Sequence, residues 1–398
     1  MNVNELIGRE RIMFADDIAA HESALSQAIA GSRVLVFGGA GSIGKEVVIQ
    51  LFRRNPAALH VIDISENNLV ELVRDIRSSL GYIEGETVFL PIDMGSVEAR
   101  AFLAAQKPYD YVLNIAAMKH VRSEKDAYSL MRMVKTNVLD TMATLEYSRS
   151  VKAKKYFAVS TDKAKNPANL MGATKRIMEG ILFDDAASGT AVSTARFANV
   201  AFSDGSLLHG FRQRLIHRQP LSAPRDIRRY FVTGPESGCL CLASLVLGEQ
   251  REIFFPKLDA GLSLLTFSDI AVRFLAVNGY EAQQVASEDE ARARTEELIA
   301  RRKWPCYFFD SDTSGEKPFE EFYSETDDVE FGRFTDIGVI RSPAPSPQDG
   351  KRLGTFVEHI LAFRQKGAWT LDELTAEIAA ACPDLSHIRT GKSLDNKM

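Results

Sequence analysis

The stretch from residue 33 to residue 44, RVLVFGGAGSIG, decides the fold: a short apolar run, RVLVF, enters a turn that carries Gly38, Gly41 and Gly44. The segment GKEVVIQLFRR, which has the length and composition of a helix, follows at once. In such a unit Gly38 permits the tight turn, Gly41 lets a pyrophosphate approach the backbone, and Gly44 lets helix and strand pack closely. The helix N-terminus adds N–H donors and a positive dipole end. The stretch therefore predicts a dinucleotide-binding turn.

The same alternation of short apolar runs and helical segments continues along the chain. Segments of helical length, such as ENNLVELVRDIRSSL and TNVLDTMATLEYSRS, separate the runs. The alternation predicts an α/β fold of Rossmann type, a doubly wound parallel sheet with helices on both faces and ligands at the carboxyl ends of its strands. The later runs, each too short for a helix, are LHVIDI from Leu59, TVFLPID from Thr87, YVLNIAA from Tyr111, KYFAVST from Lys155 and AVSTARFANV from Ala191.

The alternation breaks down after about Ser203, where prolines become frequent. We therefore expect a dinucleotide-binding Rossmann domain over residues 31–203. A smaller mixed domain, which binds the substrate and closes over the sheet, is expected over residues 204–350. The ends of the chain are expected to be helical, with an N-terminal segment over 1–30 and a C-terminal extension over 351–398.

The composition argues against several classes of function. The chain has 48 basic and 53 acidic side chains, a net charge of -5, which does not suit a surface built for nucleic acid or an anionic membrane. The N-terminus carries charge throughout, and no later stretch approaches the roughly 20 apolar residues of a membrane span. We expect a cytoplasmic protein. The four cysteines and seven histidines lack ligand spacing, so no metal site is expected.

Two carboxylates bear on the choice of cofactor. Asp63 ends the second apolar run, about 20 residues beyond the glycines, where it can accept both ribose hydroxyls of an adenosine. It would repel a 2′-phosphate, and no arginine lies between Asp63 and Val70, so NAD is favoured over NADP. A helix cap is the alternative interpretation of Asp63. Asp93 ends the third run and either meets the adenine amine or is a turn residue.

Residues 160–176, STDKAKNPANLMGATKR, begin at the carboxyl end of the fifth run, where a Rossmann sheet places its substrate. Here the chain resembles the extended short-chain dehydrogenase/reductase superfamily, and within it the UDP-N-acetylglucosamine 4,6-dehydratases of polysaccharide biosynthesis. The resemblance extends from residue 6 to about residue 322. Its supporting motifs are GGAGSIG at Gly38, DISENN at Asp63, AAMKHV at Ala116, KTNVLDT at Lys135, RFANVAFSDGS at Arg196, RRYFVTGPES at Arg228 and SGEKPFEE at Ser314.

The resemblance implies an internal redox cycle on a UDP-linked amino sugar. NAD takes a hydride from carbon 4, the resulting ketone acidifies the proton on carbon 5, the 6-hydroxyl leaves as water, and the hydride returns to carbon 6. Lys163 would take the proton from carbon 5, and Asp162 would protonate the leaving hydroxyl. Thr161 would hydrogen-bond the 4-hydroxyl, and Lys175 would hold the hydroxyls of the nicotinamide ribose. A solvated ion pair on a loop is the other interpretation of Asp162 and Lys163.

Met171 occupies the position where most short-chain dehydrogenases carry a tyrosine. A thioether cannot accept a proton, so this residue taken alone would indicate a dead site. The branch that the chain resembles, however, carries methionine in the same Met-Gly-Ala-Thr-Lys context. We therefore expect Asp162, assisted by Thr161, to accept the proton of the 4-hydroxyl and then to deliver it to the departing 6-hydroxyl. Lys163 in its protonated form would keep the carboxylate charged until then.

The expected contacts come from several loops. NAD is expected to meet Gly38, Gly41, Ser42, Ile43, Gly44 and Ala116. The resemblance assigns the nucleotide sugar to Lys119, His120, Asn199, Ser206, Arg228, Glu316 and Lys317. Six arginines between Arg212 and Arg229 suit a diphosphate, although most are expected to lie on a solvated face or at a subunit contact. The chain departs from the family at Asp204, where a basic residue is usual.

Two other functions stay open. A UDP-sugar 4-epimerase needs oxidation at carbon 4 but no acid and base for elimination, and the adjacent Asp162 and Lys163 argue against it. A non-catalytic NAD-binding sensor would fit the missing tyrosine, but Thr161 and Lys175 are retained as well. The resemblance also implies a homo-oligomer formed through the long helices.

Overall fold

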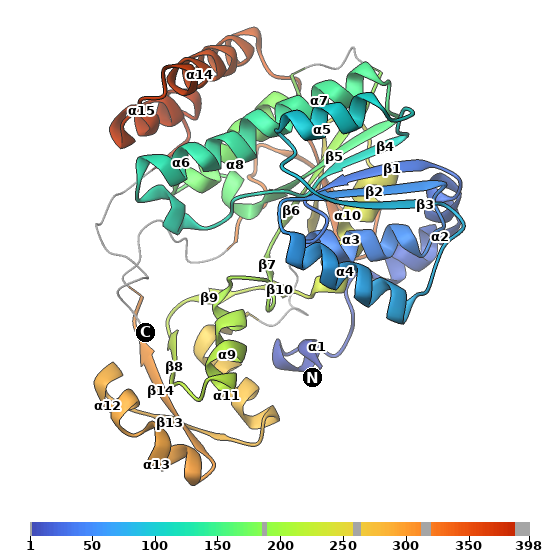
Figure 1. Cartoon of the computed structure of the whole chain (residues 1–398). Helices are drawn as coiled ribbons and strands as arrows, with labels where there is room; N and C mark the ends of the chain where they lie inside the picture. The colour runs from blue at the N-terminus through green and yellow to red at the C-terminus, as the bar shows by residue number, and fades with distance from the viewer. Residues whose placement is uncertain (1, 185–188, 258–263, 312–319, 387–398) are drawn as a thin grey trace.

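The computed structural model describes residues 2–184, 189–257, 264–311 and 320–386. A nine-stranded sheet runs through its larger body in the order β15-β16-β11-β6-β5-β4-β1-β2-β3 (Figure 1). Strands β1 to β6 and β11 are parallel to one another, whereas β16 and β15 add an antiparallel edge, which confirms the Rossmann sheet. The strands are β1 (Arg33–Phe37), β2 (Ala58–Asp63), β3 (Glu86–Pro91), β4 (Tyr111–Asn114), β5 (Lys155–Thr161), β6 (Ala191–Phe197), β11 (Glu252–Pro256), β15 (Asp328–Glu330) and β16 (Ile337–Arg341).

The order of the strands reverses at β1, which lies between β2 and β4. From there the chain builds outward through β2 and β3 on one side, and through β4, β5 and β6 on the other. In open α/β sheets, ligands bind beyond the carboxyl ends of the strands at such a switch point. The glycine turn after β1 and the Thr161 end of β5 therefore lie on the same edge of the sheet.

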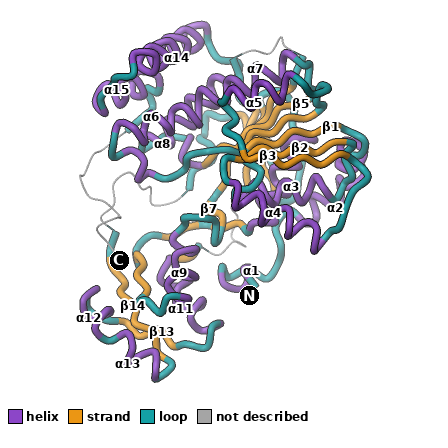
Figure 2. The backbone as a smooth tube through the Cα atoms, in the orientation of Figure 1, coloured by secondary structure: helices purple, strands orange, loops and turns teal. Residues whose placement is uncertain are grey.

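Helices cover both faces of this sheet, as Figures 1 and 2 show. Both faces of a parallel sheet are packed, so β1 and β2 are apolar and buried almost throughout. One face carries α2 (Ala15–Ile29), α3 (Ser42–Phe52), α4 (Glu66–Ser79) and α10 (Gly234–Leu247). The other carries α5 (Val97–Ala104), α6 (Ala127–Val134), α7 (Asp140–Ser150) and α8 (Leu170–Leu182).

A smaller body is built around a second parallel sheet, ordered β13-β14-β8. Its core gathers Phe211, Phe274 and Trp304, which are all buried. In Figure 1 this body is set apart from the large sheet, with β7, β9 and β10 between the two. The elements are β7 (Asn199–Val200), α9 (Leu207–Ile216), β8 (Leu221–Pro224), β9 (Arg228–Arg229), β10 (Phe231–Val232), β12 (Leu265–Thr266), α11 (Phe267–Val277), β13 (Glu281–Gln284), α12 (Glu288–Ala293), α13 (Thr295–Ala300) and β14 (Lys303–Phe309).

The boundary expected after residue 203 does not divide the structure, because later segments return to the large sheet. Helix α10 packs beside α3, and β11, β15 and β16 extend the sheet. All residues of β11 are buried, including Pro256 at its end. A run this short among prolines resembles a loop, which is why the sequence pattern missed it. Residues 1–30 are not a separate unit either: Leu6 of α1 (Val3–Leu6) packs in the smaller body and Leu25 of α2 in the larger.

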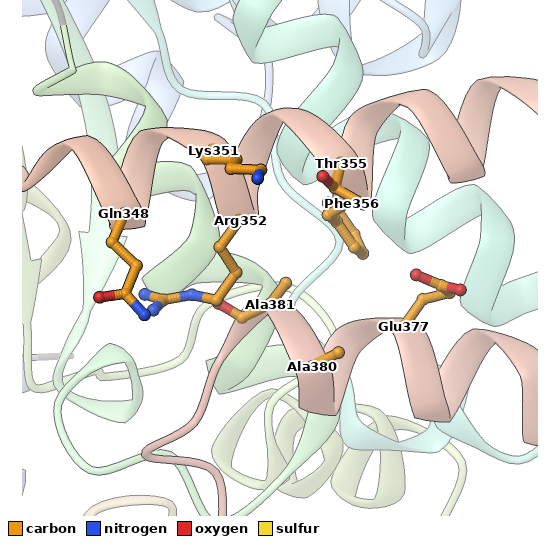
Figure 3. A pocket seen from close by; sticks show the side chains of 8 residues that line it. All are labelled: Gln348, Lys351, Arg352, Thr355, Phe356, Glu377, Ala380 and Ala381. Carbon is orange, nitrogen blue, oxygen red and sulfur yellow. The ribbon is translucent and has the colours of Figure 1, made fainter.

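The C-terminal extension is a helical hairpin of α14 (Pro347–Lys366) and α15 (Leu371–Ala381). Phe356 of α14 and Ile378 of α15 lie in one apolar cluster with Leu130 of α6 and Ile177 of α8. A hollow of about 330 Å³ lies between the two hairpin helices (Figure 3). Because the hairpin covers an apolar face of α6 and α8, a homo-oligomer formed through these two helices would require the hairpin to move.

Two features are absent from the described residues: a helix able to cross a membrane and a cluster of metal ligands. None of their helices combines the length and hydropathy that a bilayer span requires. No three His, Cys, Asp or Glu side chains among them gather as metal ligands would. The four cysteines are free, and burial raises the pKa of the Cys382 thiol to about 11, so this thiol is protonated and unreactive at neutral pH.

Phe356 tests how much the hairpin stabilises the fold. Its side chain is 2% exposed, so Phe356→Ala should lower the free energy of unfolding by about 3–5 kcal/mol through lost burial and the cavity left behind. Leu361→Ala on the same helix is the matched control. Leu361 is 51% exposed, and its loss should change the free energy by less than about 0.5 kcal/mol. Denaturant unfolding followed by circular dichroism measures both, and equal effects would contradict the packing described.

Candidate active site

Glycines without side chains line the turn after β1, at the switch point of the sheet. Gly38 has a φ of +74°, and a Cβ there would lie 2.4 Å from the backbone nitrogen of Ala116. A Cβ at Gly44 would lie 2.0 Å from the Gly38 carbonyl oxygen, so helix and strand can approach this closely only with glycine. At Gly41 the nearest atom to such a Cβ is 3.8 Å away. The turn therefore leaves room for a phosphate at Gly41, next to the N-terminus of α3.

Asp63 ends β2 and is bonded to the glycine turn. Its Oδ2 accepts the backbone N–H of Ala40 at 2.9 Å, and its Oδ1 accepts that of Ser65 at 2.9 Å. The carboxylate thus ties the turn to the start of α4. Each carboxylate oxygen has a further lone pair, so Asp63 can still accept ribose hydroxyls.

Asp93 lies in the turn that follows β3. Its Oδ1 accepts the backbone N–H of Gly95 at 2.8 Å. Nζ of Lys135 lies 3.3 Å from the same Oδ1 of Asp93. Burial alone would raise the pKa of Asp93, but the Gly95 N–H and the Lys135 ammonium outweigh it and lower the pKa. These contacts are those of a turn residue, and an adenine amine would have to share the carboxylate with them.

Thr161, Asp162 and Lys163 lie where β5 ends and the turn η3 (Asp162–Ala164) begins. Oγ1 of Thr161 donates to Oδ1 of Asp162 at 2.8 Å, and Nζ of Lys163 approaches the same oxygen at 3.4 Å. The Asp162 side chain is only 10% exposed, so this is not the solvated ion pair of the alternative interpretation. None of the described residues bonds Oδ2 of Asp162, which leaves that oxygen to a ligand.

Lys175 and Met171 lie one turn apart on α8 but in different surroundings. Nζ of Lys175 donates to the carbonyl oxygen of Val159 at 2.9 Å. Burial lowers the pKa of Lys175 to about 8, against the opposing charge of Glu179. Met171 is 3% exposed and lies in the apolar cluster that the hairpin covers. Met171 therefore serves packing, in keeping with a thioether that transfers no proton.

A buried ion pair lies directly behind these residues. Arg196 of β6 binds Glu179 of α8 through two bonds, at 2.9 Å and 2.6 Å, and Ser160 donates to the same carboxylate at 2.7 Å. Arg196 also donates to the carbonyl oxygen of Phe322. Burial alone would raise the pKa of Glu179, but the guanidinium outweighs it and lowers the pKa. Sequence reasoning missed this pair, although a charged residue in each of the apolar stretches IMEGIL and AVSTARF was a usable signal.

Asn137 is a second residue that the sequence motifs contained but did not explain. It lies, fully buried, in the π-helical turn η2 (Lys135–Leu139). Its amide exchanges two bonds with the backbone of Met118, each at 2.9 Å, and donates to Thr174 of α8 at 3.0 Å. Asn137 therefore fixes the loop after β4 against the helix that carries Lys175.

The loops expected to hold the nucleotide sugar contact each other. Nζ of Lys119 donates to Oγ of Ser203 at 3.3 Å, and a Cβ at Gly205 would lie 2.8 Å from the ring of His120. Ser206 caps α9 by accepting a backbone N–H of that helix at 3.1 Å. The structure thus brings Lys119 and His120 to the loop between β7 and α9.

Asn199 and Arg228 lie on the short strands between the two bodies. The side-chain amide of Asn199 donates to Oε1 of Glu320 at 2.6 Å. Glu320 is 7% exposed, and the sequence analysis contained it only as part of a motif. Arg228 is exposed on β9. Glu316 and Lys317 lie outside the described residues.

Ser42 bridges the cofactor side of the site to the substrate side. Its Oγ donates to Oδ2 of Asp204 at 2.8 Å and accepts the backbone N–H of Asp204 at 2.8 Å. The ring of His209 lies 3.8 Å from the same carboxylate. The acidic residue that departs from the family pattern is therefore held against the first turn of α3.

The arginines between residues 212 and 229 mostly have structural partners. Arg218 and Arg225 form exposed ion pairs within the smaller body. Arg214 donates to a backbone carbonyl at 3.1 Å, and the guanidinium of Arg212 lies 4.5 Å from the centre of the Phe202 ring. Such contacts are those of a structural surface, as expected for most of the cluster.

The chain is similar in sequence to several known proteins. The chain is 30% identical over 314 residues to an uncharacterized membrane protein of Methanocaldococcus jannaschii, covering 77% of this chain and 85% of that protein. It is 28% identical over 294 residues to the capsular polysaccharide biosynthesis protein CapD of Staphylococcus aureus, covering 72% of this chain but only 47% of CapD. A UDP-N-acetylglucosamine 4,6-dehydratase (inverting) of Campylobacter jejuni is 29% identical over 240 residues, or 58% of this chain and 68% of that enzyme.

Solved structures share the fold. Pen from Bacillus thuringiensis superposes with a TM-score of 0.63 at 23% identity, covering 79% of this chain and 89% of Pen. The dTDP-glucose 4,6-dehydratase DesIV of Streptomyces venezuelae, solved with NAD bound, gives a TM-score of 0.55 at 19% identity, covering 84% of this chain and 97% of DesIV. The model of the family described as polysaccharide biosynthesis protein matches residues 34–341, and the chain belongs to that family.

Proposed function

We propose that the chain is an NAD-dependent hydro-lyase that dehydrates a UDP-linked N-acetylhexosamine, UDP-N-acetylglucosamine, to a 4-keto-6-deoxy sugar for surface polysaccharide or glycan biosynthesis. The observation that carries the proposal is the arrangement of Thr161, Asp162 and Lys163 at the end of β5. A partly buried carboxylate there shares one oxygen with a hydroxyl and an ammonium and keeps the other for a ligand. The Campylobacter relative, whose name states this reaction, supports the same chemistry.

The residues at the switch point fit NAD. The N–H groups at the N-terminus of α3, with Ser42 and Ile43 in its first turn, would meet the pyrophosphate beside Gly41. Asp63 would accept the adenosine ribose hydroxyls, and Lys175, held at the carboxyl end of β5, would bond the nicotinamide ribose. When bound, NAD supplies a reversible hydride acceptor for carbon 4 and a donor for carbon 6, so no reductant is consumed.

Asp162 would handle the proton of the 4-hydroxyl. Its Oδ2 is the oxygen that could accept this proton while Thr161 bonds the same hydroxyl. The carboxyl would then give the proton to the 6-hydroxyl, which leaves as water, so one group acts first as base and then as acid. Met171 need not take part, since its thioether is packed among apolar side chains.

Lys163 would act on carbon 5. Its Nζ lies 3.4 Å from Oδ1 of Asp162, so the base for carbon 5 and the acid for the 6-hydroxyl would be adjacent. Lys163 would take the proton from carbon 5 as the 6-hydroxyl leaves, and carbon 5 would be protonated again after the hydride returns to carbon 6.

The substrate diphosphate would be met by Arg228 and Lys119, with Asn199 and Ser206 on the nucleotide side. The site would be reached from the cytoplasm, where UDP-linked sugars are expected. We also propose a homo-oligomer, which would use a face other than the one that the hairpin covers on α6 and α8.

Asp63→Ala should weaken NAD binding by at least about tenfold, because the ribose hydroxyls lose their acceptor. Isothermal titration of the apo protein with NAD measures the dissociation constant. Glu66→Ala is the matched control, since Glu66 is exposed in the first turn of the neighbouring helix α4. Unchanged NAD affinity in Asp63→Ala, or tighter binding of NADP than of NAD by the natural chain, would contradict the assignment.

Incubation with UDP-N-acetylglucosamine should yield a product lighter by one water, detected by mass spectrometry, with solvent deuterium incorporated at carbon 5 in D₂O. Lys163→Ala should lower turnover by at least about 100-fold while sugar binding changes little, because a general base acts in the transition state. An isomer of unchanged mass would indicate a 4-epimerase instead. Binding without any product would indicate a sensor.

A further inference from the structure

Glu320 is a buried carboxyl in the site that the reaction scheme above does not use. Its side chain is 1% exposed. Oε1 accepts the side-chain amide of Asn199 at 2.6 Å, and Oε2 accepts the backbone N–H of Tyr230 at 3.4 Å. A carboxyl in this position holds Asn199, one of the residues expected at the substrate, and connects the strands between the two bodies.

Among the described residues, the cation paired with Glu320 is Arg229 of β9. Its Nε lies 3.8 Å from Oε1, beyond hydrogen-bond distance. Arg229 also donates to the carbonyl oxygen of Arg228 at 2.9 Å. Asp162 of η3 lies close enough for its charge to act on Glu320. Within the part of the chain that the structure describes, Glu320 therefore has no cation at hydrogen-bond distance and lies under the charge of a second carboxylate. Both conditions disfavour a buried carboxylate relative to the neutral acid.

The same surroundings determine the pKa of Glu320. Burial, reinforced by the charge of Asp162 and opposed by Arg229, raises the pKa of Glu320 to about 7. Because the pKa is higher in the folded state, the contribution of Glu320 to stability is fully present below its usual value of 4.5 and is lost as the pH rises through about 7.

We propose that Glu320 is a positioning residue that works in its neutral form: it holds Asn199 in place and leaves the negative charge of the carboxyl pair on Asp162. Ionisation of Glu320 would put a second charge beside the anionic substrate. The kinetic consequence rests on the proposed function, whereas the protonation itself does not.

Infrared spectroscopy of the full-length protein tests the protonation without any substrate. The difference spectrum between the natural chain and Glu320→Gln should contain a carboxylic acid carbonyl band that disappears with a midpoint near pH 7. Glu325→Gln is the matched control, because Glu325 is exposed in the same segment and should give no such band near neutral pH. A midpoint for Glu320 below about pH 5, the range of an ordinary glutamate, would overturn the proposal.

The kinetic arm uses UDP-N-acetylglucosamine as the probe. The ratio of kcat/KM between the natural chain and Glu320→Gln should fall by at least about fivefold from pH 6 to pH 8.5, since only the natural chain acquires the second charge. A flat ratio would overturn the positioning role. If neither the natural chain nor any variant turned over the sugar, only the proposed function would be contradicted. The infrared midpoint would still test whether Glu320 is protonated near neutral pH.

Discussion

The buried ion pair of Glu179 and Arg196 is the interaction on which the rest of the site depends. It connects α8 to β6 directly, reaches the end of β5 through Ser160, and binds the chain near Glu320 through the carbonyl oxygen of Phe322. Its residues are 1% and 2% exposed, so removal of either partner would leave an uncompensated buried charge at a loss of about 3–5 kcal/mol. The neighbouring elements β5, α8 and β6 are thereby fixed to one another and to the segment at Phe322, which is more than a hundred residues further along the chain.

The ion pair of Glu179 and Arg196 fixes the backbone close to two carboxyl groups, those of Asp162 and Glu320. The neighbour of Ser160 on the chain is Thr161, which bonds Asp162, so a residue anchored to the ion pair precedes the reactive carboxyl. On the opposite side, Glu320 precedes the anchored segment at Phe322 by two residues. The backbone beside each of the two carboxyls is therefore anchored to the same ion pair. A rigid frame of this kind suits proton transfers, which require donor and acceptor within hydrogen-bond distance.

The parts of the fold that depend on neighbours in sequence could be predicted, and those that depend on distant contacts could not. The turn at Gly38 and the strand end at Asp63 could be predicted because a strand, a tight turn and a second strand end are local features. The position of Asp162 directly after β5 is local as well, whereas its role is a proposal. Glu320 could not be identified as part of the site, since its significance comes from Asn199 and Asp162, both more than a hundred residues away. The return of β11 to the sheet was missed for the same reason, because a short buried run among prolines has no local signature.

The proposed mechanism requires Asp162 to act first as the base for the 4-hydroxyl, because Met171 occupies the position where most short-chain dehydrogenases carry a tyrosine. Single-turnover absorbance of the bound nicotinamide after mixing with UDP-N-acetylglucosamine tests this most directly, because it follows hydride transfer separately from water loss. We predict that the Asp162→Asn enzyme no longer reduces its bound nicotinamide. The Met171→Leu enzyme, which changes only an apolar shape, should reduce its bound nicotinamide at a rate close to that of the natural chain. Reduction at the natural rate in Asp162→Asn would mean that another group takes the proton from the 4-hydroxyl.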